Sequence, residues 1–125
     1  MFRYVAIVFF AFIVCVNAAN IRAEENSSPE FFSVLQDVPL MDGMEELTEH
    51  ALSFDKPEGR ISESIALMHM VTKEQVLDFY KEALPQFGWG LVSQGQFFRK
   101  GELLEIFFEN DNGDNLVKIT IKPSL

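Results

Sequence analysis

TKEQVLDFYKEALPQFGW, residues 72–89, is amphipathic along its length, and the rest of the chain can be arranged around it. Thr72 is a suitable helix N-cap, and Gln75 three residues later completes a capping box, so a helix is predicted to begin there. At about 100° per residue the apolar side chains gather on one side of this helix, which predicts one buried face. That apolar set is Val76, Leu77, Phe79, Tyr80, Ala83, Leu84 and Phe87.

The same segment contains the signals that end the helix. Pro85 has no N–H to donate back to Lys81, so regular helix is predicted to stop near it. Gly88 can adopt the left-handed conformation that closes a helix. Trp89 then enters a strand, and the aromatic residues Phe79, Phe87 and Trp89 are predicted to belong to the core.

Segments of alternating hydrophobicity lie on both sides of this helix. Before it, residues 50–55 and 60–70 flank Lys56–Gly59, whose Pro and Gly are typical of a turn. In the second of these strands Ile65 and Leu67 are predicted to meet the helix. After it, Asn112-Gly113 favours a type I′ hairpin turn. The predicted strands after the helix are 89–93, 97–100, 103–109 and 116–122, the last with Val117, Ile119 and Ile121 on one face.

This order of two strands, a helix and then three or four strands predicts an α+β fold: an antiparallel sheet of about five strands with one long amphipathic helix packed across one face, in ββαβββ order. The predicted domain comprises residues 31–125, which is long enough for one small core and too short for two.

The N-terminal 18 residues have the pattern of a cleavable secretory signal. A basic residue, Arg3, precedes an apolar run from Tyr4 to Val16, and small residues follow. The run is shorter than the about 20 residues that span a bilayer, which disfavours an uncleaved anchor. Residues 19–30 are predicted to be a flexible leader. The sequence therefore predicts export to the periplasm or beyond, with no integral membrane segment left after cleavage. The cleavage site is open among Ala18, Ala19 and Ala23.

Charge and cysteine content limit the function classes. The whole chain has a formal net charge of −9, and its one cysteine, Cys15, lies within the predicted signal, so the mature chain should contain no disulfide. Nucleic acid is disfavoured as a partner, because phosphate binding needs a cationic surface.

Residues 31–44, called the arm below, are too apolar for a free tail. Phe31, Val34, Leu35 and Val38 have the spacing of a short helical turn, and Pro39 ends it. The arm either covers an edge or face of the sheet or inserts into a partner. In the second case the partner-binding residues are Phe31, Phe32, Leu35, Leu40 and Met41.

A catalytic constellation is not evident in the sequence, and no cofactor is predicted. One alternative is a small hydrolase or isomerase that uses carboxylates with His50 or His69. Another is a copper carrier, because thioether and imidazole ligands suit Cu(I). Its candidate ligands are Met68, His69 and Met70, with Met41, Met44 and His50 elsewhere. Strand alternation places His69 on the face opposite to Met68 and Met70, so this tripeptide alone cannot close a site.

Several strings are similar to a family of small exported alphaproteobacterial proteins of uncharacterised function. They are DVPLM (37–41), FDKPEGRI (54–61), VLDFYKEALPQFGW (76–89) and ITIKP (119–123). The resemblance implies a periplasmic setting and a helix-on-sheet fold, with no catalytic residues to carry over. We therefore expect a non-enzymatic module that binds a protein or an envelope component. The oligomeric state is left open by the sequence.

Overall fold

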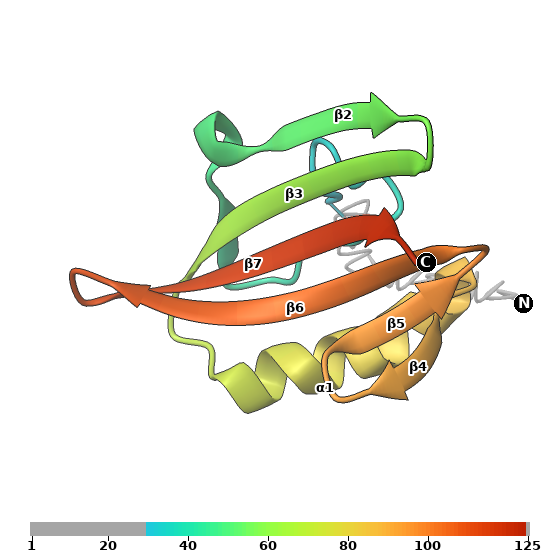
Figure 1. Cartoon of the computed structure of the whole chain (residues 1–125). Helices are drawn as coiled ribbons and strands as arrows, with labels where there is room; N and C mark the ends of the chain where they lie inside the picture. Colours follow the sequence, from blue (N-terminus) through green and yellow to red (C-terminus); the bar gives the residue numbers. More distant parts are fainter. Residues whose placement is uncertain (1–29, 125) are drawn as a thin grey trace, which may run out of the picture.

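The structure is a computed structural model that describes residues 30–124 (Figure 1). The predicted signal peptide and nearly all of the predicted leader lie outside these residues. The chain forms one seven-stranded antiparallel sheet with the order β1-β3-β7-β6-β5-β4, and β2 also pairs with β3. The strands are β1 (Met44–Glu46), β2 (Leu52–Lys56), β3 (Gly59–Met68), β4 (Gly90–Ser93), β5 (Gln96–Arg99), β6 (Glu102–Asp111) and β7 (Asp114–Pro123). The helices are α1 (Lys73–Ala83) and the 3₁₀ turns η1 (Thr48–His50) and η2 (Leu84–Phe87).

The predicted fold class, about five strands with one long helix in ββαβββ order, is wrong. The domain is mostly β, with three strands before α1 and four after it. The α-helix has 11 residues, because the proline at position 85 converts its last turn to η2. The strand β1 was missed because its three residues are too few to show an alternating pattern.

Local signals at both ends of α1 act as predicted. The Thr72 side chain accepts a hydrogen bond from the Gln75 N–H, and the Gln75 side chain accepts one from the Thr72 N–H, so the capping box is complete. At the other end Gly88 has a φ of 88°, in the left-handed region. The buried side chains of α1 and η2 are those of Val76, Tyr80 and Leu84.

The turns predicted from Pro, Gly and Asn also form. β2 and β3 make a hairpin at Pro57-Glu58, and β6 and β7 make one at Asn112-Gly113. Asn112 and Gly113 have φ values of 51° and 89°, as a type I′ turn requires. The β6–β7 hairpin extends beyond the rest of the sheet at the left of Figure 1.

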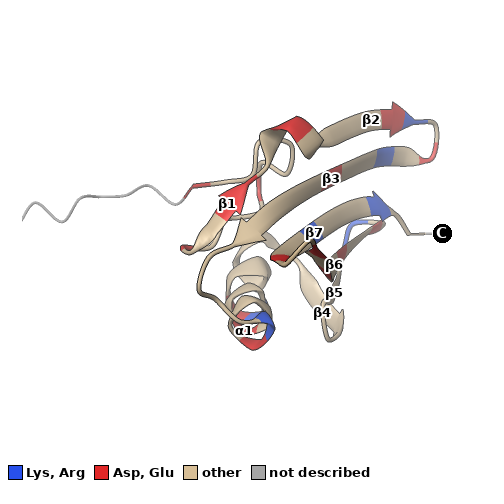
Figure 2. Cartoon of the chain, turned by 90° about the vertical axis from the view of Figure 1, so that its left-hand side faces the viewer, with Lys and Arg blue, Asp and Glu red and all other residues tan. Residues whose placement is uncertain are grey.

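The core lies between one face of the sheet and two coverings, α1 and the arm. In Figure 1 both coverings lie behind the sheet, and Figure 2 shows them to one side of it. On β7 the side chains of Val117, Ile119 and Ile121 point into this core, as predicted. Trp89 is also buried, whereas Phe79 and Phe87 are only partly buried.

The predicted inward face of β3 is wrong. Register pairs Ser64 with Ile119 and Ala66 with Val117, so these small side chains face the core. Ile65 and Leu67, which were expected to meet the helix, point to the opposite face. Ala66 belongs to the same buried cluster as Phe32, Leu35 and Val38 of the arm.

The arm is a tight loop rather than the short helical turn predicted from its spacing. The Phe32 N–H donates to the Val38 carbonyl at 3.1 Å, and the Leu40 N–H donates to the Glu30 carbonyl at 2.7 Å. The buried Tyr80 hydroxyl donates to the Pro39 carbonyl at 2.7 Å and so ties the arm to α1. Residues 30–124 contain no helix of the length and apolar character needed to cross a bilayer.

Candidate binding surfaces

The face of the sheet opposite α1 and the arm carries no covering layer among the described residues, and we call it the open face. At one edge of it, Leu47 and His50 line a cavity together with Ile65 and Leu67. The open face points toward the viewer in Figure 1. Strand alternation and register place a set of apolar side chains on it. They are Leu52, Phe54, Ile61, Ile65, Leu67, Phe98, Leu103, Phe107 and Leu116.

Four of these side chains are exposed to an unusual degree for large apolar groups. Leu52, Phe54, Phe98 and Phe107 retain between 41% and 47% of their accessible surface. Phe98 is opposite Gly90 on the neighbouring strand, so no side chain of β4 covers its ring there. A cluster of exposed aromatic and aliphatic groups on one face marks a contact surface more often than isolated exposed residues do.

A polar row divides the open face into two apolar bands. Across β3, β7, β6 and β5, Glu63 is opposite Thr120, Thr120 is opposite Glu105, and Glu105 is opposite Gln96. One band contains the pairs Phe54–Ile61 and Leu103–Phe98. The other contains Ile65, Leu67, Phe107 and Leu116, with Lys118 between Ile65 and Phe107.

The lysines of the open face are already paired with carboxylates. Lys118 Nζ lies 3.0 Å from Glu109 Oε1, and Lys122 Nζ lies 2.8 Å from Glu105 Oε1. The hydrogen bond that Lys118 donates to the Glu109 carboxylate raises the pKa of Lys118 above its ordinary value. The ammonium of Lys118 also lies 5.4 Å from the centre of the Phe107 ring. Both lysines are paired with carboxylates. The negative charge of Glu63 therefore gives the polar row an acidic character.

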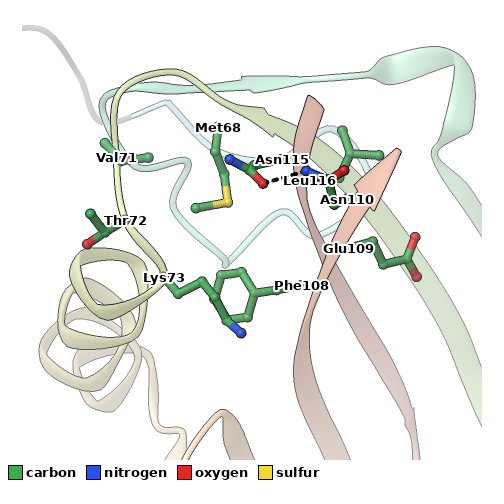
Figure 3. Close-up of a pocket in the computed structure, with 9 residues that line it drawn as sticks. All are labelled: Met68, Val71, Thr72, Lys73, Phe108, Glu109, Asn110, Asn115 and Leu116. Atoms are coloured by element: carbon green, nitrogen blue, oxygen red, sulfur yellow. Dashed lines mark hydrogen bonds between the residues drawn. The ribbon is translucent and has the colours of Figure 1, made fainter. Parts of the chain in front are cut away.

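Two cavities lie near the β6–β7 hairpin. One, of about 290 Å³, is lined by His50, Ile65, Glu109 and Asp111 among others, and it adjoins the open face. The other, of about 400 Å³, lies at the start of α1 and is lined by residues that include Met68, Lys73 and Phe108 (Figure 3). Among residues 30–124, no group of three or more His, Cys, Asp or Glu side chains is placed to hold a metal ion.

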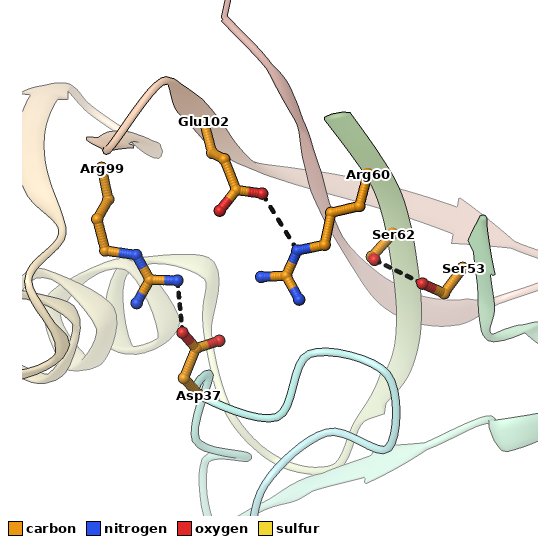
Figure 4. A network of polar contacts seen from close by, with 6 residues as sticks. All are labelled: Asp37, Ser53, Arg60, Ser62, Arg99 and Glu102. Atoms are coloured by element: carbon orange, nitrogen blue, oxygen red, sulfur yellow. Dashed lines mark hydrogen bonds and ion pairs between the residues drawn. The ribbon is translucent and has the colours of Figure 1, made fainter. Parts of the chain in front are cut away.

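A polar network joins the arm to the sheet on the covered side (Figure 4). Arg99 pairs with Asp37 of the arm, donates to the Phe87 carbonyl at 2.9 Å, and stacks 4.2 Å from the centre of the Trp89 ring. Nearby, Arg60 Nε donates to Glu102 Oε2 at 3.1 Å. These contacts hold structural elements together, so we assign them to the scaffold.

The structure places the five predicted partner-binding residues of the arm in different environments. Phe32 and Leu35 are buried in the domain core, and Leu40 and Met41 are partly buried against it. Phe31 is exposed, and its ring packs edge-on against Phe87 with 5.8 Å between centroids. The arm therefore covers its own sheet, and this conformation leaves Phe31 as the accessible member of the set.

The candidate copper ligands are not brought together by the turn that contains them. Met68 is opposite Met44 in the β1–β3 pair and packs against the core. His69 Nε2 lies 2.8 Å from Glu45 Oε2 on the exposed surface. Met70 is fully exposed. His50 lies in η1, within 4.0 Å of Glu49.

Sequence reasoning missed the open face as a surface. The signal was present in the alternation of β3, which separates Ile65 and Leu67 from Ser64 and Ala66. The larger set was assigned to the core because it is more apolar.

No family model, curated protein or solved structure matches this chain.

Proposed function

We propose that this chain is a non-enzymatic binding module that recognises another protein through the open face of its sheet. One observation carries the proposal: Leu52, Phe54, Phe98 and Phe107 are all on one uncovered face and each keep about two-fifths or more of their surface exposed. Large aromatic side chains supply much of the binding energy at protein interfaces. The two apolar bands offer such anchors on either side of an acidic row, so the fitting partner presents apolar side chains and a basic group between them.

The proposed setting is the bacterial periplasm. Its support is the secretory pattern of residues 1–18 and the resemblance to small exported alphaproteobacterial proteins. Both of these supports come from the amino-acid sequence. An envelope protein is therefore the class of partner we propose first.

The experiment uses surface substitutions rather than removal of the arm, because Phe32, Leu35 and Val38 are part of the core and their loss would unfold the domain. The open-face variant carries Phe54→Ser and Phe107→Ser, one change in each band. The control carries Met70→Ser, which removes a fully exposed apolar side chain from a turn outside the sheet.

Each protein is immobilised and used to capture partners from the envelope fraction of the producing cells. We expect wild type and control to retain the same protein, and the open-face variant to retain at least about tenfold less, since the loss of two aromatic anchors costs more than 1.4 kcal/mol. Equal retention by the open-face variant would refute the open face as the recognition surface. Hydrogen exchange of β3 and β6 in the presence of the captured protein locates the contact directly.

A further inference from the structure

The strand β4 forms one edge of the sheet and carries neither a charged side chain nor a proline, although it is only four residues long and its pairing with β5 shifts register between Leu91 and Ser93. Among residues 30–124 it pairs with β5 alone, and no other backbone hydrogen bond reaches Gly90–Ser93. Proteins commonly protect such edges with charged side chains or proline. β4 reads Gly-Leu-Val-Ser, whereas β2 on the opposite edge ends in Asp55 and Lys56.

A groove of about 270 Å³ lies between this edge and α1. The helix contributes Leu77, Asp78 and Lys81 to its wall, and the strands contribute Leu91 and Phe97. Small-molecule sites usually start at about 300 Å³ and are more enclosed by apolar groups. The groove therefore suits one or two side chains of another polypeptide better than a cofactor.

Both sides of β4 present exposed apolar groups to such a polypeptide. Leu91 lines the groove and keeps 49% of its surface exposed, and Val92 keeps 62%. If a second β4 pairs with this strand in antiparallel fashion about a two-fold axis, the backbone groups of both edges are satisfied. The same face of each sheet then remains on the same side, so Leu91 of each copy lies beside the groove of the other.

The groove carries one acidic and one basic side chain, so the grooves of two copies of the chain can have complementary charges. Asp78 and Lys81 are three residues apart on α1, so they lie on the same side of the helix. Neither forms an ion pair with another residue within 30–124. Where the two α1 helices lie side by side across a two-fold axis, their residues run in opposite order, which places Asp78 of one copy opposite Lys81 of the other. An unrelated peptide need not carry a basic group opposite Asp78 and an acidic group opposite Lys81.

We propose that the chain forms a symmetric dimer in which two β4 edges pair into one continuous sheet and each copy fills the groove of the other. This site is separate from the open face, so the dimer carries two open faces on the same side.

Sedimentation equilibrium of the purified protein over a micromolar concentration series tests the proposal. We expect a dimer in the wild type. Leu91→Lys introduces an edge-protecting charge and should raise the dissociation constant by at least about tenfold. The matched control is Phe54→Lys on β2, an equally exposed apolar position on the opposite edge, which should leave the dissociation constant unchanged.

A charge exchange tests the axis itself. Lys81→Glu alone places an acid against each Asp78 across the axis and should weaken the dimer about tenfold, whereas the double variant Asp78→Lys with Lys81→Glu restores the pairing with the charges reversed. Thermal melting of each variant confirms that the fold is retained. A wild type that remains monomeric overturns the proposal, and so does a dimer that is insensitive to Leu91→Lys. A dimer weakened by Phe54→Lys would overturn it too, because association would then use the opposite edge or the open face.

Discussion

Replacement of Tyr80 by Phe tests whether one buried hydrogen bond fixes the arm to α1. Tyr80 has no exposed surface, and its hydroxyl donates to the Pro39 carbonyl at 2.7 Å. Phe at this position keeps the ring and its edge contact with Phe79, whose centroid lies 4.9 Å away. The substitution therefore removes little besides the hydroxyl.

The expected cost follows from what the Pro39 carbonyl loses. Pro39 is buried, and no other hydrogen bond to its carbonyl occurs within residues 30–124. A buried acceptor left without its donor costs about 1–3 kcal/mol, and we take about 2 kcal/mol as the expected loss. In a domain of this size that corresponds to a fall in Tm of roughly 8–16 °C.

Urea unfolding followed by the fluorescence of Trp89, which is the single tryptophan and is buried, measures this loss. Hydrogen exchange measured in parallel should accelerate in residues 31–41 and stay unchanged in β6 and β7. Tyr80→Leu serves as a second variant that also removes the ring, so it must cost more than Tyr80→Phe. A loss below about 0.5 kcal/mol, with unchanged exchange in the arm, would show that the hydrogen bond does not hold the arm.

Two other predictions concern pH and the start of α1. Burial raises the pKa of Tyr80 above its ordinary value of about 10, so the folded chain keeps a proton that the unfolded chain releases, and stability should fall as pH rises past about 10. Urea midpoints at about pH 9 and about pH 11 should therefore differ less in Tyr80→Phe than in wild type, and equal differences would contradict this reasoning. Thr72→Ala removes the capping box and should cost about 1 kcal/mol in thermal unfolding. The control is Thr48→Ala. Thr48 is an exposed residue of η1, and the N-cap of η1 makes no side-chain hydrogen bond. This substitution should change stability by less than about 0.5 kcal/mol.

The parts of the fold that the sequence predicted correctly depend on neighbouring residues. Thr72 and Gln75 are three residues apart, Pro85 and Gly88 act within one turn, and Asn112-Gly113 forms its own turn. The strand count was wrong because β1 is defined by its pairing with β3 rather than by any pattern of its own. The helix is shorter than predicted because Pro85 converts its last turn to η2.

The open face could not be predicted for a related reason. Alternation divides a strand into two sets of side chains but does not state which set points inward. In β3 the inward set is the smaller one, and Ala66 of that set shares a buried cluster with Phe32, Leu35 and Val38 of the arm, which is distant in sequence. The arm itself was recognised as a packing element from its composition. The burial of Phe32 and Leu35 within the core depends on tertiary contacts that no local pattern contains.

The central position of β7 affects when the domain can fold. β7 lies between β3 and β6, and it joins Ser62 to Ile121, roughly 60 positions apart in the sequence. During synthesis the first three strands therefore have no partner across β3 until residues 114–123 have emerged, and the core cannot close before then. The β3–β7 and β6–β7 pairings that close the core therefore form only after the last described strand has been made.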